Sequence, residues 1–513
     1  MKLNEYVKGA NKTINYELSE DERMLQAAMG MTGEAAEVMD IIKKARSHIF
    51  IIVMTVIHMV TGSILNLADD GAYYWVWSRH LDISYYDHPP MIAYLIKIFT
   101  SIFGNNNFAV RLVPVLSVMV TSIYIYKIIK YLYNDEKKAF TAVVIYNIIP
   151  LFSMTSILVL PDLPLIMFYT AGLYYFLRII YEKKAKLWYL LAILTGLGLL
   201  SKYNMFLVYP GIFFYLLLNS DDRYWLKRKE PYIAFIVSVL FFLPVLIWNY
   251  NHEWISFAFH LYNRHSHELT LKPDLFLLFI LVQMIIVSPV IFIGFWTAIF
   301  NNFSRKDVRI LFFYGMPVFL IFMLASLVTE FKVHWTAMAY IPFLIIFAAY
   351  NKWNRIWKYS GIVLAIIFSL FFYVQSFYPF LKIDPHSDIT TDFHGWDMVG
   401  REVGEIYKNL NKDEWFLFSS RYQVASQLYF YLPEENYVYS LNNKIEQYDF
   451  WQKEEGLKDK NGLFVTHSFY RVLPGEKYNF SDIELVKKIN VIRAGEIYRT
   501  FYIYKCYNYQ GVK

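Results

Sequence analysis

Long apolar runs alternate with short polar breaks along the chain from residue 49 to residue 377. An α-helix rises about 1.5 Å per residue, so roughly 20 apolar residues cross the hydrocarbon core of a bilayer. The apolar runs lie at 49–67, 108–126, 139–157, 163–180, 187–201, 204–219, 232–249, 273–300, 310–328, 335–350 and 360–377. The pattern predicts an all-α polytopic membrane protein with about eleven spans.

The composition agrees with the pattern. Of 513 residues, 57% are hydrophobic, 19% are aromatic and only 18% are charged. The net charge of +6 is small, and the lysines and arginines form short clusters between apolar runs, which excludes a nucleic-acid-binding surface. The single cysteine, Cys506, excludes an intramolecular disulfide and a cysteine-based metal cluster.

The basic clusters predict the orientation of the chain. Every second connection between apolar runs is basic, and the intervening connections are not. The basic residues are Lys43, Lys44, Arg46, Lys127, Lys130, Lys137, Lys138, Arg178, Lys183, Lys184, Lys186, Arg223, Lys227, Arg228, Lys229, Arg305, Lys306, Arg309, Lys352, Arg355 and Lys358. Cytoplasmic loops are enriched in such residues, so we expect a plasma-membrane protein with a cytoplasmic N-terminus and an extracytoplasmic C-terminal tail.

The same alternation places the polar segments on one face of the membrane. The segments at 68–107, 161–164, 201–203, 248–272, 330–335 and beyond 378 are all expected on the outer face. They are rich in acidic, basic and aromatic residues. The sequence therefore predicts an outward-facing active site.

Two parts of the chain lie outside the predicted membrane domain of residues 49–377. Residues 378–513 lack long apolar runs, and a helix at 396–410 followed by short β-rich runs predicts a small α/β domain. The β-rich runs lie at 415–418, 437–439, 463–466, 484–492 and 498–507. Residues 1–48 predict one or two soluble helices.

The N-terminal segment contains Glu34, Glu37 and Asp40, which are three residues apart on one helical face. It resembles the opening of MazG-like nucleotide pyrophosphohydrolases, in which such carboxylates bind Mg²⁺. In that family a second acidic helix completes the site, whereas here the chain continues into the first apolar run. A solvated helix face is the simpler interpretation.

The polar stretch after the first apolar run contains the candidate general base. Asp69 and Asp70 precede residues 72–78, which predict an amphipathic helix on the membrane surface. In one interpretation, either aspartate simply caps that helix. In the other, Asp70 takes a proton from an acceptor hydroxyl, and partial burial against Tyr73, Tyr74 and Trp75 raises its pKa.

Further acids and bases lie at the other breaks. Asp87 and His88 precede two prolines, which fix an extended backbone. Asp162 lies in a short break between two spans, where it can pair with Lys202 or share a cation with Asp87. Lys202 itself can extend toward the membrane surface or bind a lipid phosphate.

Two outer connections contain histidines. His252, Arg264, His265 and His267 lie on one, and Lys332, His334 and Trp335 lie on the other. A histidine cluster suggests zinc, but the spacing matches no metal-site signature. A cationic rim for a phosphate is the more economical interpretation.

Six stretches, in order, resemble the bacterial branch of the protein mannosyltransferase and aminoarabinose transferase superfamily. They are Asp-Gly-Ala-Tyr-Tyr-Trp at 70–75, Tyr-Tyr-Asp-His-Pro-Pro at 85–90, Leu-Pro-Asp-Leu-Pro at 160–164, Leu-Leu-Ser-Lys-Tyr at 199–203, Leu-Ile-Trp-Asn at 246–249 and His-Trp-Thr-Ala-Met-Ala-Tyr at 334–340. The stretches at 421–431 and 447–451 look like the extracytoplasmic tail of that branch. The resemblance covers about residues 50–510 and implies a GT-C-fold glycosyltransferase that uses a polyprenyl-phosphate sugar.

The resemblance also implies roles for individual residues. Asp70 matches the catalytic acid of the first outer loop, and Asp87 and Asp162 match acids that bind a divalent cation (Mg, Mn or Zn) or orient the donor. His88 and Lys202 match phosphate contacts. The expected substrate-binding set is Asp69, Tyr74, His88, Lys202, His252, His334 and Trp335. One departure is Gly71, which stands where the family commonly has a second acid.

The expected reaction is inverting transfer of a hexose or pentose from the lipid donor to a lipid, glycan or protein of the cell envelope. Asp70 deprotonates the acceptor, and His88 and Lys202 stabilise the leaving polyprenyl phosphate. A lipid-linked sugar transporter or flippase is the main alternative, although no internal repeat is visible. The second alternative function is a nucleotide-hydrolysing sensor that depends on residues 1–45.

Overall fold

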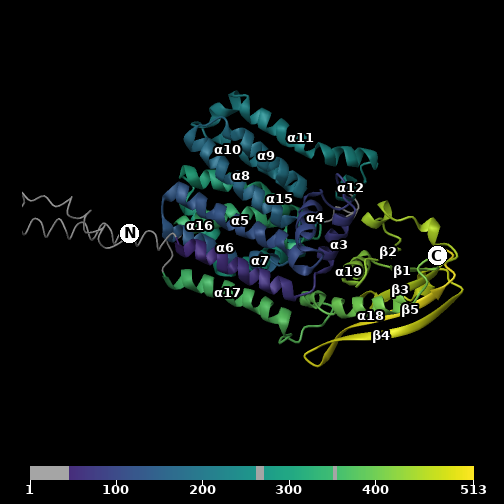
Figure 1. The fold of residues 1–513 in the computed structure, drawn as a ribbon. Coiled ribbons are helices and arrows are strands. Elements are labelled where there is room, and N and C mark those ends of the chain that lie inside the picture. The colour runs from purple at the N-terminus through teal and green to yellow at the C-terminus, as the bar shows by residue number, and fades with distance from the viewer. Residues whose placement is uncertain (1–44, 261–270, 351–354) are drawn as a thin grey trace, which may run out of the picture.

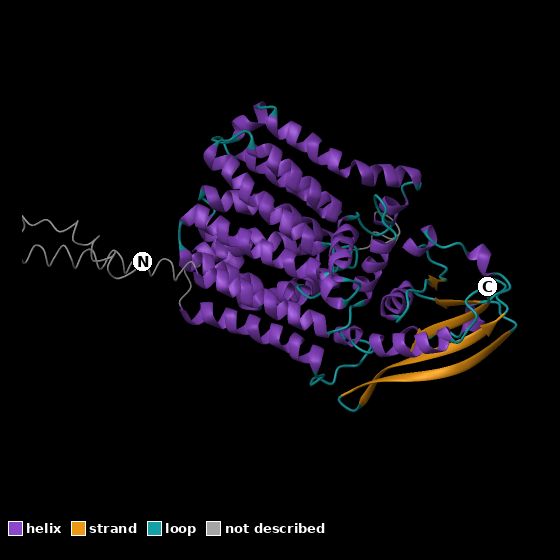
Figure 2. Ribbon diagram, in the orientation of Figure 1, coloured by secondary structure: helices purple, strands orange, loops and turns teal. Residues whose placement is uncertain are grey.

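The computed structural model describes residues 45–260, 271–350 and 355–513. Figures 1 and 2 show a bundle of helices with a small mixed α/β unit at one end. The MazG-like stretch lies outside the described residues, as do Arg264, His265 and His267.

Seven helices within the described ranges are long and apolar enough to cross a membrane. They are Ala45–Ile64, α5 (Asn107–Tyr133), α8 (Asp162–Glu182), α11 (Glu230–Asn251), α15 (Lys306–Ala325), Val333–Tyr350, which comprises η4 (Val333–Thr336) and α16 (Ala337–Tyr350), and Tyr359–Phe377 within α17 (Arg355–Phe377). A bent pair, α13 (Pro273–Val287) and α14 (Pro289–Asn302), would add an eighth span. Three apolar helices are shorter: α4 (Met91–Phe103), α9 (Leu187–Ser201) and the segment Tyr203–Leu218, made of η1 (Tyr203–Leu207) and α10 (Val208–Leu218).

All eleven predicted runs fall on helices, but the count of eleven spans is not confirmed. Proline explains two of the breaks, since it lacks the backbone donor that continues a helix. The run at 139–157 is divided into α6 (Glu136–Ile148) and α7 (Pro150–Thr155). The run at 273–300 bends by 99° at Ser288, which has a left-handed φ of 84° just before Pro289.

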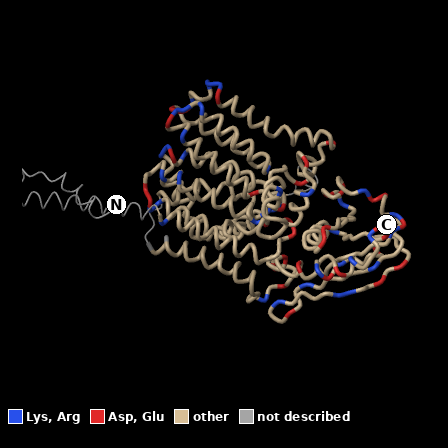
Figure 3. Tube along the Cα trace, in the orientation of Figure 1, with Lys and Arg blue, Asp and Glu red and all other residues tan. Residues whose placement is uncertain are grey.

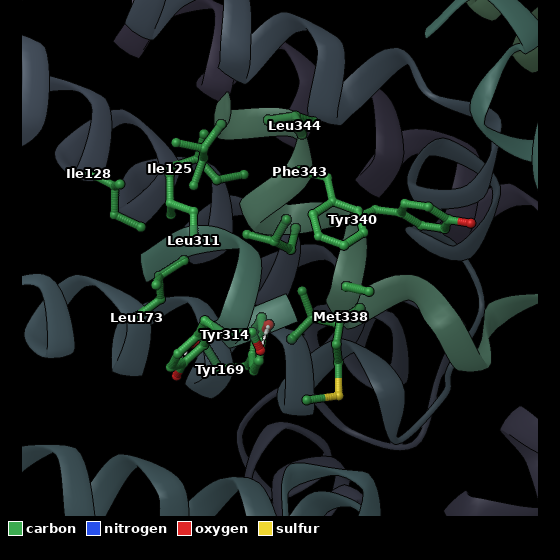
Figure 4. Packing of buried hydrophobic residues seen from close by; sticks show 14 of the residues in the cluster. Ile125, Ile128, Tyr169, Leu173, Leu311, Tyr314, Met338, Tyr340, Phe343 and Leu344 are labelled. Atoms are coloured by element: carbon green, nitrogen blue, oxygen red, sulfur yellow. Dashed lines mark hydrogen bonds between the residues drawn. The ribbon is translucent and has the colours of Figure 1, made fainter. Parts of the chain in front are cut away.

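The core of the bundle is apolar and aromatic. Figure 4 shows side chains of α5, α8, α15 and α16 packed together around Tyr169 and Tyr314. The two tyrosines donate to each other's backbone carbonyls, at 3.0 Å and 3.2 Å, so neither buried hydroxyl is left without a partner. Figure 3 shows that charged residues gather at the ends of the bundle and on the C-terminal unit.

The C-terminal domain follows α17. Its five-stranded sheet has the order β2-β1-β3-β5-β4, formed by β1 (Trp415–Ser419), β2 (Val438–Ser440), β3 (Asn461–His467), β4 (Asp482–Arg493) and β5 (Glu496–Tyr507). β1 pairs in parallel with β2 and β3, whereas β5 is antiparallel to β3 and β4. The five predicted strands and the predicted helix, α18 (Trp396–Lys408), are therefore confirmed.

A helix of the C-terminal domain packs directly on the first connection of the bundle. That helix is α19 (Tyr422–Tyr431), and its partner is α3 (Asp69–Arg79). The residues from Gly71 to Ser78 in α3 are all buried. The helix was predicted correctly, but its placement as an amphipathic surface helix was wrong, because α19 covers the face that would otherwise meet water or lipid.

Candidate functional site

A buried ion pair lies at the end of the bundle that faces the C-terminal domain. Lys202 Nζ is 2.9 Å from Asp162 Oδ1 and 2.8 Å from Asp162 Oδ2. His334 Nε2 lies 3.7 Å from the same Oδ2 atom. Asp162 begins α8, where the helix dipole favours a negative charge, and Lys202 lies in the extended residue between α9 and η1. The structure thus brings together three predicted site residues from separate connections.

Lys202 also lines a cavity of about 430 Å³. Its polar end is formed by His88, Lys202 and His260, and Trp335 lies on its wall. The remaining lining residues are Tyr203, Asn204, Phe206, Leu207, Ile321, Phe322 and Ala325. Most of these side chains are apolar, so the cavity combines an apolar wall with a basic end.

Asp87 and His88 are held at this basic end by contacts on both sides. Tyr73 Oη donates to Asp87 Oδ2 at 2.8 Å, and His260 Nε2 lies 2.6 Å from the backbone oxygen of Asp87. The rings of His88 and His260 are 5.7 Å apart, centre to centre, and the ring of Tyr74 is 6.3 Å from that of His88. Burial is the main cause that raises the pKa of Tyr74 above its ordinary value, with further contributions from Asp70, Asp87 and Asp162. Tyr74 therefore lies among the three predicted acids and keeps its hydroxyl proton.

Asp69 and Asp70 occupy the first turn of α3 but do not cap it. The N-cap residue is Ala68, and no side chain accepts a capping hydrogen bond there. Asp70 is an exposed residue, and its charge contributes to the raised pKa of Tyr74. Asp69 accepts a hydrogen bond from Gln427 Nε2 at 3.0 Å, and burial raises its pKa. The two adjacent carboxylates thus have different surroundings, and Asp70 is the more exposed of the two residues.

His252 lies apart from the cavity. Its ring stacks on Trp248 at 4.0 Å, centre to centre, and its Nδ1 lies 2.8 Å from the Trp248 carbonyl. Trp248 in turn donates to Asp82 Oδ2 at 2.9 Å. His252 therefore belongs to an aromatic contact between α11 and the first connection, and the structure does not bring it to the other predicted substrate-binding residues.

The hydrogen bonds of Asp87 and Asp162 determine whether the predicted cation site can hold an ion. Both oxygens of Asp162 are bonded to Lys202, and Asp87 Oδ2 accepts from Tyr73. No group of three or more His, Cys, Asp or Glu side chains suited to a metal ion occurs among the described residues. A cation shared by Asp87 and Asp162 would have to displace Lys202, so this arrangement does not fit a bound cation and the site stays a prediction.

Several residues near the site were missed by the sequence interpretation. His260 lies among aromatic residues and carries no local signal of its own. Gln427, Gln447 and Arg499 come from the C-terminal domain, more than 300 positions from the loop that they approach. Gln427 and Gln447 lie in stretches that resemble the family's tail, which was the only available signal.

Two acids of the C-terminal domain, the buried Glu446 and the half-buried Asp392, have raised pKa values. Burial, together with nearby Asp69, raises the pKa of Asp392 to about 7, although the Arg499 guanidinium 3.5 Å away opposes the shift. Burial raises the pKa of Glu446 to about 8. Both groups take up protons near neutral pH, so the region between α3 and the C-terminal domain is sensitive to pH.

The chain is similar to known sequences that are named as glycosyltransferases. Residues 87–248 match the family described as dolichyl-phosphate-mannose-protein mannosyltransferase. The chain is 27% identical over 375 residues to lipid A galacturonosyltransferase RgtD of Rhizobium johnstonii, covering 72% of this chain and 78% of that protein. It is 26% identical over 273 residues to undecaprenyl phosphate-alpha-4-amino-4-deoxy-L-arabinose arabinosyl transferase 1 of Proteus mirabilis, covering 49% of this chain and 47% of that relative.

The fold is similar to that of a solved bacterial protein, ArnT from Cupriavidus metallidurans. The apo structure superposes with a TM-score of 0.66 at 14% identity and covers 91% of this chain and 98% of that chain. The structure of the same protein bound to undecaprenyl phosphate gives a TM-score of 0.65 at 13% identity, covering 89% and 97%. At this identity the comparison shows a shared fold.

Proposed function

We propose that this chain, a GT-C-fold membrane glycosyltransferase of the protein mannosyltransferase and aminoarabinose transferase superfamily, transfers a sugar from a polyprenyl-phosphate donor to an acceptor of the cell envelope. The acceptor is a lipid, glycan or protein. Relatives named as lipid A and undecaprenyl-phosphate sugar transferases support the proposed acceptor in the cell envelope and the proposed polyprenyl-phosphate donor.

The observation that supports this function best is the cavity beside Lys202. An apolar wall suits an isoprenoid chain, and a basic end suits a phosphate. Lysine binds phosphate as a compact charge with three donors, and only two of the donors of Lys202 are used by Asp162. The remaining N–H is available to a phosphate oxygen in the cavity.

In the proposed mechanism, Asp70 is the general base. Its exposed carboxylate takes the proton of an acceptor hydroxyl or amine, and the acceptor atom then attacks the anomeric carbon of the donor sugar. The bond between the anomeric carbon and the phosphate oxygen breaks, and the electron pair leaves with the polyprenyl phosphate. A single displacement of this kind inverts the configuration at the anomeric carbon.

The leaving group gains negative charge in the transition state, and cationic side chains near it lower the barrier. Lys202 and His88 face the cavity in which that charge would develop. Asp162 orients Lys202 through two hydrogen bonds, and His334 lies beside the same carboxylate. Asp162 therefore acts by positioning Lys202.

The basic connections support a plasma-membrane orientation in which the N-terminus is cytoplasmic. Figure 3 shows lysines and arginines gathered at the end of the bundle away from the C-terminal domain. In this orientation the cavity and the C-terminal domain are extracytoplasmic, where lipid-linked sugars and envelope acceptors meet.

The test is a transfer assay with purified protein in lipid vesicles, using polyprenyl-phosphate sugars and extracted envelope lipids. Asp70→Asn should lower kcat by about 10²–10⁴-fold, the range for loss of a general base, while donor binding is kept. Asp413→Asn, at an exposed position of the C-terminal domain outside the site, is the control. Wild-type protein that binds and moves the lipid donor across vesicles without transferring sugar would instead support the flippase alternative.

A further inference from the structure

We propose that Gln427 and Gln447 of the C-terminal domain are positioning residues, which hold the two ends of the loop that contains Asp70, Asp87 and His88. The proposal rests on the function proposed above. Both glutamines are fully buried, and each makes hydrogen bonds to this loop across more than 350 positions of sequence.

Gln427 holds the start of the loop. Its Nε2 donates to the backbone oxygen of Leu67 at 2.9 Å and to Asp69 Oδ1 at 3.0 Å, so both amide hydrogens are used on residues just before Asp70. One turn later on α19, Tyr431 Oη accepts from the Leu67 backbone N–H at 2.7 Å. Together these contacts fix the backbone from which the Asp70 side chain projects.

Gln447 holds the end of the loop. Its Oε1 accepts from the backbone N–H of Tyr86 at 2.6 Å, and its own backbone N–H donates to Tyr73 Oη at 3.2 Å. That hydroxyl in turn donates to Asp87 Oδ2. A single residue of η6 (Gln447–Phe450) therefore fixes the backbone beside Asp87 and, through Tyr73, its carboxylate.

Neither glutamine lines the donor cavity, so their effect should reach catalysis through geometry. A displacement of about 1 Å of a reacting group can cost about 10²-fold in rate. Replacing either glutamine by leucine keeps the volume close to that of the original side chain and removes the hydrogen bonds. The loop should then sample positions in which Asp70 and Asp87 are misaligned.

Gln452 provides a matched control in the same domain. It is also a glutamine with two hydrogen bonds to backbone, donating to Ser440 O at 2.6 Å and accepting from Ser440 N at 3.1 Å. Both bonds stay within the C-terminal domain. Gln452→Leu therefore loses similar bonds without altering the loop.

The experiment measures kcat, donor KM and the unfolding temperature of wild-type protein, Gln427→Leu, Gln447→Leu and Gln452→Leu in vesicles. We expect kcat to fall by about 10- to 100-fold in the first two variants and to stay within about 3-fold of wild type in Gln452→Leu. Donor KM should change little in Gln427→Leu and Gln452→Leu, whereas Gln447→Leu should also raise it, because His88 follows Asp87 in the loop end that Gln447 holds. Assays are run below the lowest unfolding temperature of the set, so that only folded protein is compared.

The outcomes separate the two proposals. Wild-type protein without transfer activity would overturn the proposed function itself. Active wild-type protein with equal kcat losses in all three variants would show a merely structural role for Gln427 and Gln447. Unchanged kcat in both Gln427→Leu and Gln447→Leu would also overturn the positioning proposal.

A second surface is the turn of the β4–β5 hairpin, residues 493–496, which reaches the end of α17 (Figure 1). Arg493 Nη2 donates to the backbone oxygen of Gln375 at 2.7 Å. On the other strand, Glu496 Oε1 lies 3.5 Å from Lys382 Nζ. The turn is thus fixed at the level of the last turns of a helix that is long and apolar enough to span a membrane.

Two isoleucines beside this turn are exposed. Ile492 and Ile497 pair across the strands and are 62% and 56% exposed. Leu381 and Ile389 in the neighbouring segment are also exposed. The turn lies beside the end of α17, which also exposes apolar residues: Leu370, Phe371, Val374 and Phe377.

We infer that the hairpin turn lies in the interfacial layer of the bilayer, with Ile492 and Ile497 in contact with phospholipid. Exposure of two paired isoleucines to water is unfavourable, and contact with lipid removes it. The position beside the end of α17 identifies lipid as the occupant of this surface. The contact would hold the C-terminal domain at a fixed height over the membrane.

Cysteine labelling can test this contact, because the single native cysteine, Cys506, is buried. Ile497→Cys is labelled with an environment-sensitive fluorophore in phosphatidylcholine vesicles with and without brominated acyl chains. The control is Leu485→Cys, an exposed position on the same strand pair, roughly 23 Å from Ile492 at 3.3 Å per residue. We expect bromine quenching at position 497 and little at 485. Equal quenching at both positions, or none at 497, would overturn the inference.

Discussion

Lys202 Nζ lies within 2.9 Å of both carboxylate oxygens of Asp162, and the two side chains are almost fully buried. The pair joins the start of α8 to the break after α9 and lies beside the basic end of the cavity. A buried charge is costly without its partner, so each residue depends on the other for stability. Stability and catalysis can be separated at this pair.

Removing one member of the pair should reduce both properties. Lys202→Met leaves the Asp162 carboxylate without its main partner, and we expect a loss of about 3–5 kcal/mol in unfolding free energy. Transfer should also fall by at least about 10²-fold, because the cation beside the leaving phosphate is gone. Thermal unfolding and a donor titration check the two effects separately.

The double variant Asp162→Asn with Lys202→Met distinguishes the role of Lys202 in stability from its role in transfer. We expect it to recover most of the lost stability, since no unpaired charge remains, while transfer stays low. Recovery of transfer together with stability would show that Lys202 has only a structural role.

The two histidines predicted for substrate binding should behave differently. His88 lines the cavity, whereas His252 stacks on Trp248 away from it. We therefore expect His88→Ala to raise the donor KM by about 10-fold or more, a loss of about 1.4 kcal/mol of binding, and His252→Ala to leave donor KM near the wild-type value. Steady-state kinetics with varied donor concentration measure both. Similar KM changes in the two variants would contradict this assignment.

Chelation tests the predicted cation. The oxygens of Asp162 are bonded to Lys202, and one oxygen of Asp87 is bonded to Tyr73, so we expect EDTA-washed protein to keep its transfer rate. Adding Mg²⁺, Mn²⁺ or Zn²⁺ should then have little effect. A loss of activity that one of these ions restores would show that a cation displaces the ammonium group of Lys202.

The stability of the C-terminal domain should depend on pH through Glu446. Burial raises its pKa from an ordinary value near 4.5 to about 8 in the folded protein. Between these values the folded state holds a proton that the unfolded state has lost. The stability contributed by Glu446 is therefore fully present below about pH 4.5 and is lost as the pH rises to 8, by up to about 1.4 kcal/mol per pH unit.

Glu446→Gln should remove this contribution, because the amide stays neutral at every pH. Between pH 5 and pH 8 we expect the unfolding temperature of this variant to fall less than that of wild type. The residual slope should reflect Asp392, whose pKa is also raised. Parallel curves for the two proteins would show that Glu446 is ionised in the folded state.

Much of the fold could be predicted from the sequence because its signals are local. Apolar runs of helical length, proline breaks and alternating strands depend on neighbouring residues, and all eleven runs and five strands fall where expected. The number of spans could not be predicted in the same way. Pro150 and Pro289 mark breaks in two of the runs, but only the structure shows that the second of these runs bends by 99° at Ser288.

The burial of α3 is another feature of the site that local sequence patterns do not predict. Its sequence next to two aspartates favoured a surface position, but α19, more than 350 residues later, covers it. That contact buries Gly71 to Ser78, places Asp69 on Gln427 and leaves Asp70 exposed. No local pattern predicts such a difference between two adjacent carboxylates.

By itself, the sequence determined the membrane-protein class, the position of most helices, the C-terminal α/β domain and the short set of acids and bases worth testing. Only the tertiary structure decided which of them meet: Lys202 with Asp162, His88 with the cavity, His252 with Trp248 and Gln447 with the Asp87 loop. The physical reason is the distance along the chain between the residues that interact. Helix and strand patterns arise from contacts a few residues apart, whereas the site is made of side chains that only the packing of the bundle and its C-terminal domain brings within hydrogen-bonding distance.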